Sequence, residues 1–274
     1  MTDKSEWQGN VGTTWAEEYR RTDRSFSQLT EQLLALTRHF VFSRVLDVGC
    51  GAGELSLAIA RGRPDVSVIG VDVSPQLVDV ARERASHLAN VQFELADAAQ
   101  WRCDPSVAPD LLVSRHGVMF FDDPPAAFAH LAAQAAPKAG MLFSCFRSPS
   151  ENPFFSEVVR LLPDPPERGD PLAPGPFAFA DGTRVHAILS ESGWSQISVT
   201  PVDFPMIAGT GADPVGEAVT YFSRIGPAAK AAAQMEPEAR ERFFKRIRAL
   251  AERHEHGGIV ALPAAAWIVT ARKG

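Results

Sequence analysis

The stretch that decides the fold is Val45-Leu46-Asp47-Val48-Gly49-Cys50-Gly51-Ala52-Gly53. Its first half is short, apolar and branched, which is typical of a buried strand, and we predict that strand over residues 44–49. The glycines that follow interrupt the strand and let the main chain approach a ligand closely. A helix is predicted next, through residues 55–60, and the N-terminus of a helix favours polar groups. The segment therefore predicts a strand, a glycine turn and a helix around a ligand.

The spacing within this turn narrows the choice of ligand. Glycine turns also occur in nicotinamide and flavin enzymes, but their fingerprint is G-x-G-x-x-G. Here Gly49, Gly51 and Gly53 follow a G-x-G-x-G pattern, and Asp47 lies two residues before the first of them. A carboxylate at the end of a strand could receive a cationic ammonium group. A turn that merely packs the strand against the helix is the structural alternative.

Strands and helices alternate on the C-terminal side of this corner. Further strands are predicted at residues 66–71, 91–95, 110–114 and 141–146. Ser74 before Pro75 and Asp123 before Pro124 are typical of helix starts. This alternation indicates βαβ units, a parallel sheet and right-handed crossovers that place helices on both faces.

The flanking regions are less regular. Apolar residues at helical spacing predict a helix over residues 26–40. Eight prolines fall between residues 149 and 176, which predicts a loop-rich insertion with a short helix near 154–162. A helix at 181–192, strands at 196–202 and 266–271, and a mostly helical insertion between those strands complete the chain.

Composition limits the classes of function. The chain has 274 residues, 45% of them hydrophobic, and a net charge of −6. It contains no apolar run of about 18 residues and no signal-like N-terminus, so we expect no membrane span and a cytoplasmic location. The basic stretch at 240–253 is interleaved with glutamates, which disfavours a nucleic-acid partner. Three widely spaced cysteines predict neither a disulfide framework nor a zinc site, and we expect no metal.

Residues 45–53 resemble motif I of the class I S-adenosylmethionine-dependent methyltransferases, and the resemblance covers roughly residues 7–146. Within that family the chain looks most similar to the ubiquinone- and menaquinone-biosynthesis branch. The resemblance implies S-adenosylmethionine as cofactor, with Asp47, Gly49 and Gly51 lining its amino-acid end and Cys50 counted among the binding residues. A buried structural cysteine is the alternative for Cys50.

The same resemblance assigns the two following strand ends. Asp72, at the end of the second strand, could accept hydrogen bonds from both ribose hydroxyls. Asp97 is implied to accept from the adenine amino group, and Val73 and Ala98 to flank the ring. A helix-terminal charge at Asp72 and a surface aspartate at Asp97 are the alternatives.

Ligands of open α/β sheets bind where the strand order reverses, so the loop after the fourth strand should face the methyl group. Ser114 and Arg115 are expected to touch the cofactor through backbone atoms. His116 could be a general base on a hydroxyl or amine, although many relatives only position the acceptor. Trp15 and Tyr19, four residues apart, would share a helix face over the cofactor, with ordinary core packing as the alternative.

The resemblance implies a single α/β domain over residues 1–274. Its Rossmann-like, doubly wound sheet would have seven strands, mostly parallel with one antiparallel. We expect an N-terminal helical cover at 1–40, a cofactor-binding core at 41–148, and insertions at 149–180 and 205–262 that form a substrate lid. Phe177 and Phe179 are candidates for that cover.

The implied reaction is methyl transfer to an O, N or C nucleophile of a small molecule, by a monomer or homodimer. Other readings stay open. The fold could serve aminopropyl transfer or a nicotinamide-dependent reaction, or the chain could be a catalytically silent cofactor-binding subunit. Two other motifs are set aside: Asp123-Pro124-Pro125-Ala126 is better explained as a helix cap, and His254-Glu255-His256 lies at a helix end without an evident third metal ligand.

Overall fold

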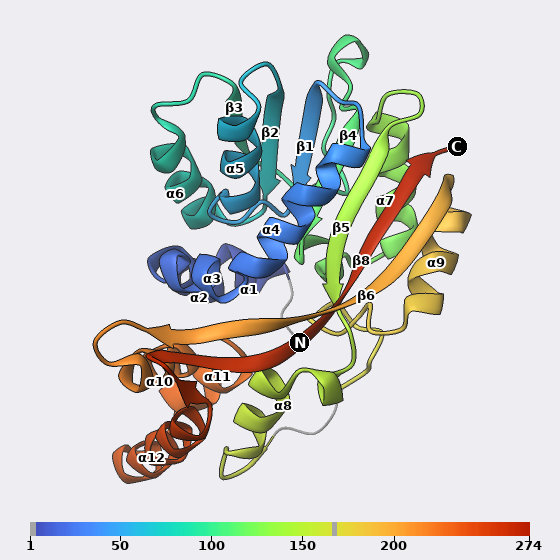
Figure 1. Ribbon diagram of the computed structural model, residues 1–274. Helices are drawn as coiled ribbons and strands as arrows, with labels where there is room; N and C mark the ends of the chain where they lie inside the picture. The colour runs from blue at the N-terminus through green and yellow to red at the C-terminus, as the bar shows by residue number, and fades with distance from the viewer. Residues whose placement is uncertain (1–3, 166–168) are drawn as a thin grey trace.

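A computed structural model describes residues 4–165 and 169–274 (Figure 1). One sheet runs through it in the order β3-β2-β1-β4-β5-β8-β6, with β7 paired to β8. The strands are β1 Arg44–Val48, β2 Ser67–Asp72, β3 Val91–Leu95, β4 Leu111–Arg115, β5 Gly140–Phe146, β6 Trp194–Thr210, β7 Glu255–His256 and β8 Ile259–Lys273. Strands β1 to β5 all run parallel to one another, whereas β8 runs antiparallel to both β5 and β6. The predicted fold class is confirmed, with the two-residue β7 added.

Helices connect and cover these strands. Ser74 Oγ accepts from the Leu77 amide at 3.4 Å, and Asp123 accepts from the Ala126 amide at 3.0 Å, so both predicted helix caps are confirmed. The α-helices are α1 Lys4–Gln8, α2 Asn10–Glu17, α3 Tyr19–Ser25, α4 Ser27–Leu36, α5 Glu54–Gly62, α6 Pro75–Ala85, α7 Pro124–Gln134, α8 Pro153–Arg160, α9 Gly182–Glu191, α10 Pro214–Arg224, α11 Pro227–Ala233 and α12 Pro237–Arg253. Short 3-10 helices are η1 Thr37–His39, η2 Pro105–Val107, η3 Gly117–Phe120 and η4 Pro149–Glu151.

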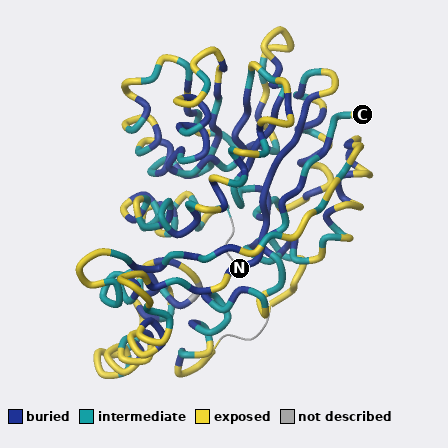
Figure 2. Tube along the Cα trace, in the orientation of Figure 1, coloured by how far each residue is buried: buried dark blue, intermediate teal, exposed yellow. Residues whose placement is uncertain are grey.

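The sheet is packed on both faces. A Cβ at Gly140 would lie 2.3 Å from the ring of Phe40, just after η1, so this face of β5 lies under the N-terminal helices. Phe143 points to the opposite face, because side chains alternate along a strand. It meets Phe128 of α7 with ring centroids 5.6 Å apart. Figure 2 shows the buried residues following the strands, with exposed residues on the outer turns of the helices.

The strand order reverses at β1, whose neighbours are β2 and β4. At their carboxyl ends two glycines allow the loops to touch. A Cβ at Gly49 would lie 2.7 Å from Gly117 Cα, and one at Gly117 would lie 2.4 Å from the Val48 carbonyl oxygen. Ser114 Oγ donates to that carbonyl at 2.6 Å and accepts from the Gly117 amide at 3.1 Å. This junction fixes the edge where ligands of such sheets bind.

The last two long strands extend well beyond the predicted segments 196–202 and 266–271. They form a long antiparallel pair that runs out of the main sheet to helices α10, α11 and α12 (Figure 1). The insertion predicted at 205–262 is therefore strand at both ends and helical only in α10, α11 and α12. Prolines at 201 and 205 concealed this in the sequence, but β6 is an edge strand, where a missing amide donor is tolerated.

The N-terminal cover also differs from its prediction. The helix breaks at Glu18, so Trp15 belongs to α2 and Tyr19 begins α3, and they do not share one continuous helix face. The buried Glu18 carboxylate is paired with Arg21 and with Arg224 of α10, which holds the corner between the two helices.

Parts of two predicted segments, residues 1–3 of the cover and 166–168 of the proline-rich insertion, lie outside the described residues. None of the helices in the described part of the chain is long and apolar enough to cross a bilayer.

Candidate active site

A cavity of about 920 Å³ lies at the carboxyl ends of β1 to β4, and residues of the N-terminal helices and of α8, α10 and α11 also line it. Most of the residues predicted for the site line it. These are Trp15, Asp47, Gly49, Cys50, Gly51, Asp72, Val73, Asp97, Ala98, Arg115 and His116. Ser114 and Tyr19 are not among the lining residues, because Ser114 bonds within the junction of β1 and β4 and Tyr19 packs elsewhere.

Asp47 is a nearly fully buried carboxylate at the end of β1, with 1% of its surface exposed. It accepts a hydrogen bond from Ser56 Oγ at 2.6 Å, and no cation forms an ion pair with it among the described residues. Burial raises its pKa to about 6 against the lowering effect of the Ser56 hydrogen bond. A buried carboxylate of this kind is stabilised by any cationic group that enters the cavity.

Asp72 fastens two of the loops that surround the cavity. Its Oδ2 accepts from the Gly51 amide at 2.8 Å, and its Oδ1 accepts from the Ser74 amide at 2.9 Å. Burial nevertheless raises the pKa of this carboxyl. Each oxygen retains a lone pair for a further donor. The Asp72 carboxylate thus holds the glycine turn and the loop after β2 together and can still accept a hydrogen bond from a ligand.

At the end of β3, Asp97 contacts a residue that the sequence did not indicate. Lys4 of α1 lies 2.7 Å from Asp97 Oδ2, while the Ala99 amide donates to Oδ1 at 2.9 Å. The first helix therefore closes over this end of the cavity. No spacing or motif in the sequence connects positions 93 residues apart.

A second group missed from the sequence joins α3 to the glycine turn. Arg84 of α6 lies 2.8 Å from Asp23 and 2.9 Å from Glu54, and Arg115 lies 3.6 Å from the other Asp23 oxygen. Burial raises the pKa of Asp23, while Arg115 and Arg84 oppose that shift. The Arg84 guanidinium also lies 4.5 Å from the Tyr19 ring centroid. Tyr19 therefore supports this network from outside the cavity.

His116 begins the turn after β4 with a positive φ of 65°. Its ring stacks on Phe146, with centroids 3.9 Å apart and planes inclined by 19°, and meets the edge of Phe26 at 5.5 Å. Both imidazole nitrogens are buried and lack a hydrogen-bond partner among the described residues. Burial, aided by the charge of Arg115, lowers the pKa of His116 to about 3. A neutral imidazole is a weak base but a ready hydrogen-bond partner, so the general-base role stays a prediction.

The N-terminal aromatic residues meet at the cavity. Trp7 and Trp15 pack edge to face at 5.2 Å, and Trp7 packs in the same way against Phe120 of η3. The Trp7 indole nitrogen is buried without a partner among the described residues. Together these rings form part of the roof above the β4 loop.

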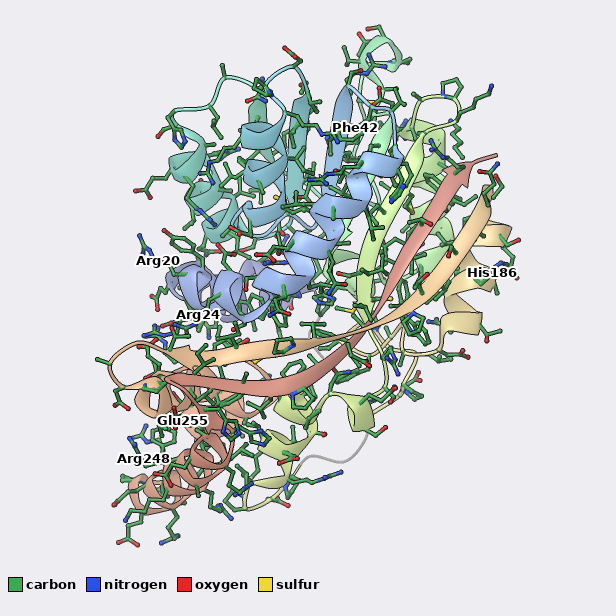
Figure 3. The ribbon with its side chains drawn as sticks, in the orientation of Figure 1. Arg20, Arg24, Phe42, His186, Arg248 and Glu255 are labelled. Carbon is green, nitrogen blue, oxygen red and sulfur yellow. The ribbon has the colours of Figure 1, made fainter. Side chains whose placement is uncertain are left out.

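Ion pairs attach the cover to the lid. Arg21 of α3 donates to Glu217 of α10 at 2.9 and 3.1 Å, and Arg24 lies 3.3 Å from the same carboxylate. Arg24 also donates to the Ala208 carbonyl of β6 at 3.0 Å, and Figure 3 shows it between α3 and that strand. Lys230 of α11 lies 2.8 Å from Glu6 of α1. The cavity is therefore roofed by segments from both ends of the chain.

The two lid candidates from the proline-rich insertion have different positions. Phe177 packs against Phe146 and Phe155, both of which line the cavity. Phe179 is fully buried beside Phe128 of α7, on the other side of the sheet from α4. The structure thus places Phe179 in the core and not in the substrate cover, because the insertion folds back beneath the sheet after residue 177.

Comparison with known proteins agrees with this geometry. Residues 45–138 match a protein family described as a methyltransferase domain. The chain is 36% identical over 105 residues to trans-aconitate 2-methyltransferase from Methylobacterium radiotolerans, a match that covers 38% of each chain. It is 35% identical over 120 residues to phosphoethanolamine N-methyltransferase 1 of Arabidopsis thaliana, covering 43% of this chain and 24% of that one. The chain thus spans less than half the length of these two curated relatives.

Solved structures show the same fold over most of the chain. The YcgJ protein of Bacillus subtilis matches with a TM-score of 0.55 at 20% identity, covering 89% of this chain and 98% of that one. Phosphoethanolamine N-methyltransferase 2 of Haemonchus contortus, solved with phosphomonomethylethanolamine and S-adenosylhomocysteine, matches with a TM-score of 0.54 at 17% identity over 89% of this chain and 53% of that one. The predicted quinone-biosynthesis branch is not tested by these relatives. Residues 45–138 therefore match a methyltransferase domain in sequence, and most of the chain shares the fold of these solved structures.

Proposed function

We propose that this protein binds S-adenosylmethionine in the cavity and transfers its methyl group to a small molecule. The observation that carries the proposal is the arrangement of three carboxylates. Asp47, Asp72 and Asp97 close three neighbouring parallel strands, and all three line one cavity beside the glycine turn. The cofactor of this family has an ammonium group, a ribose and an adenine, which need acceptors in that order.

The residues present fit this cofactor. The buried Asp47 carboxylate, which lacks an ion-pair partner among the described residues, would hold the ammonium group. A Cβ at Gly51 would meet no atom within 4 Å, so the turn leaves open space beside it. Asp72 would accept from the ribose hydroxyls and Asp97 from the adenine amino group, with Val73 beside the ring. When bound, S-adenosylmethionine supplies a methyl carbon to which the acceptor's lone pair bonds, while the sulfur keeps the electron pair of the broken bond and the acceptor's proton departs.

The protein's own residues would orient the acceptor and exclude water. Because the methyl group is already activated, alignment of the acceptor can supply much of the rate. The ion pairs between cover and lid hold the roof over the cavity. His116, which is neutral and whose ring nitrogens have no partner among the described residues, would form one hydrogen bond with the acceptor and so fix its approach.

The relatives support methyl transfer but differ in the atom that accepts the methyl group. Their names describe a 2-methyltransferase acting on trans-aconitate, an N-methyltransferase acting on phosphoethanolamine, and a malonyl-[acyl-carrier protein] O-methyltransferase from a Paenibacillus species. We propose a small-molecule acceptor for this chain and leave its nucleophile open. A cytoplasmic monomer or homodimer without a nucleic-acid partner is part of the same proposal.

Calorimetric titration with S-adenosylhomocysteine, the unreactive product, tests cofactor binding. We expect binding to the native chain and none with NAD. Asp72→Ala should weaken binding by about 1–3 kcal/mol, because ribose hydroxyls lose their acceptor. Asp110→Ala is a matched control, since Asp110 also accepts from backbone amides, those of Ser43 and Arg44, but at the opposite edge of the sheet. That variant should lose stability and keep its affinity.

Two results would contradict the proposal, and a third would contradict the role of Asp72. Binding of NAD in place of S-adenosylhomocysteine would move the chain to another enzyme class. Tight binding of S-adenosylmethionine with no methyl transfer across a broad acceptor panel would favour a silent cofactor-binding subunit. Equal loss of affinity in the Asp72 and Asp110 variants would remove Asp72 from the binding site.

A further inference from the structure

The part of the cavity around His116 is walled by aromatic rings from separate segments. We call Phe26, Phe146, Phe154, Phe155 and Tyr221 the aromatic wall, and all of them line the cavity. Phe146 lies 5.8 Å from Phe26 and 5.5 Å from Phe154 between ring centroids, so these three rings form one continuous surface, and Phe155 and Tyr221 line the same cavity. Such a surface favours apolar and ring-shaped ligands.

The charges around the cavity disfavour an anionic ligand. The described lining residues include three basic side chains besides His116: Lys4, Arg115 and Lys230. Each already has a partner: Lys4 pairs with Asp97, Arg115 pairs with Asp23 and Thr30, and Lys230 pairs with Glu6. The carboxylates that line the cavity outnumber these cations; they are Glu6, Asp23, Asp47, Glu54, Asp72, Asp97, Asp122, Asp123 and Asp164. A carboxylate or phosphate on the acceptor, in addition to the carboxylate of the cofactor, would face this excess of carboxylates and find each described lining cation already paired.

The imidazole of His116, which contacts two rings of the aromatic wall, has no hydrogen-bond partner among the described residues. The two nitrogens of His116 are buried without a partner among the described residues, while the ring itself is held between Phe146 and Phe26. A buried polar group without a hydrogen bond costs stability, and a ligand that supplies one gains binding energy. The geometry therefore calls for a ligand that is apolar except at one hydrogen-bonding atom.

We propose that the methyl acceptor is an uncharged, predominantly apolar ring compound whose hydroxyl group hydrogen-bonds to His116. The ring packs against the aromatic wall, and the hydroxyl occupies the position that the imidazole leaves unpaired. The proposal rests on the function proposed above, since it names the acceptor of the same site.

Binding to the native chain saturated with S-adenosylhomocysteine tests this directly. The probes are 2-naphthol, naphthalene, trans-aconitate and phosphoethanolamine, measured by calorimetry and by the fluorescence of the two arenes. We expect 2-naphthol to bind at least about tenfold more tightly than either anion, a difference of about 1.4 kcal/mol. We also expect it to bind about five- to tenfold more tightly than naphthalene, as one hydrogen bond provides.

The variant His116→Phe keeps a ring between Phe146 and Phe26 and removes the nitrogens. It should bind naphthalene as before and lose the preference for 2-naphthol. Tighter binding of an anion than of 2-naphthol by the native chain, or an unchanged preference in a folded variant, would overturn the proposal while S-adenosylhomocysteine still binds. Failure of S-adenosylhomocysteine to bind would instead overturn the proposed function and, with it, the acceptor. The comparison of probes on the native chain decides the matter even if the variant does not fold.

Discussion

Replacing Asp47 by asparagine should stabilise the folded chain at neutral and higher pH while weakening cofactor binding. The carboxyl is 1% exposed and has Ser56 Oγ as its hydrogen-bond donor at 2.6 Å. Burial raises its pKa from 3.8 to about 6. At about 1.4 kcal/mol for each pH unit, ionising this group in the folded chain costs about 3 kcal/mol relative to the unfolded chain.

The sign of the pH dependence follows from the direction of the shift. Between pH 3.8 and about 6 the folded chain holds the Asp47 proton more tightly than the unfolded chain does. The stabilising effect of that proton is greatest below the unfolded pKa and is lost as the pH rises through 6. The buried Asp47 carboxyl therefore lowers the free energy of unfolding by about 1 kcal/mol at pH 4.5 and by about 3 kcal/mol at pH 8. The stability of Asp47→Asn minus that of the native chain should therefore rise by about 2 kcal/mol between these pH values.

Urea unfolding of both proteins at pH 4.5 and pH 8 measures this difference, and any fixed cost of the asparagine cancels in the subtraction. The exposed Asp65, replaced by asparagine, is the control and should change stability by less than about 0.5 kcal/mol at either pH. Titration of the Asp47 variant with S-adenosylhomocysteine should show weaker binding, because the ammonium group loses its counter-charge.

A stability difference that is the same at both pH values would refute the electrostatic reasoning, because it would mean that Asp47 has an ordinary pKa in the folded chain. Unchanged affinity for S-adenosylhomocysteine would separate Asp47 from the ammonium group and assign it a purely structural role with Ser56.

Two further predictions concern the loop after β4. The pKa of His116 is lowered to about 3, so below pH 6.5 the unfolded chain takes up a proton that the folded chain does not bind. In urea unfolding, the free energy of unfolding of His116→Gln minus that of the native chain should therefore rise by about 2 kcal/mol between pH 7 and pH 5. A constant difference would contradict the lowered pKa. A Cβ at Gly117 would lie 2.4 Å from the Val48 carbonyl oxygen, so Gly117→Ala should lose about 1–3 kcal/mol in the same assay. The control is Gly62→Ala, in which the added Cβ would meet no atom within 4 Å; this variant should be as stable as the native chain or slightly more so. Equal losses of stability in the Gly117 and Gly62 variants would exclude the steric cause.

Local sequence was sufficient for the parts of the site that lie along the strand ends. Asp47, Asp72 and Asp97 each follow an apolar run, and residues at the carboxyl ends of neighbouring parallel strands must share one edge of the sheet. The glycine turn could likewise be recognised, since the backbone positions with positive φ at Gly49 and Gly51 strongly favour glycine.

The cover and the lid could not be derived in this way. Lys4 meets Asp97, and Arg21 meets Glu217, across separations for which the sequence has no periodicity. Glu18, at the break between α2 and α3, likewise pairs with Arg224, which lies far along the chain. The full length of the antiparallel pair β6 and β8 could not be predicted from the sequence, because prolines in β6 argue against a strand until its place at the sheet edge is known.

The α/β order, the glycine turn and the three strand-end carboxylates could be predicted before folding, because they depend on apolar periodicity and on backbone conformations within a few residues. The folded chain was needed to show that both His116 ring nitrogens are buried without a partner among the described residues, that the ring contacts Phe146 and Phe26, and that the described cations lining the cavity are already paired. Burial and ion pairing depend on which distant segments meet, and for that reason the character of the acceptor pocket emerged only from the folded chain.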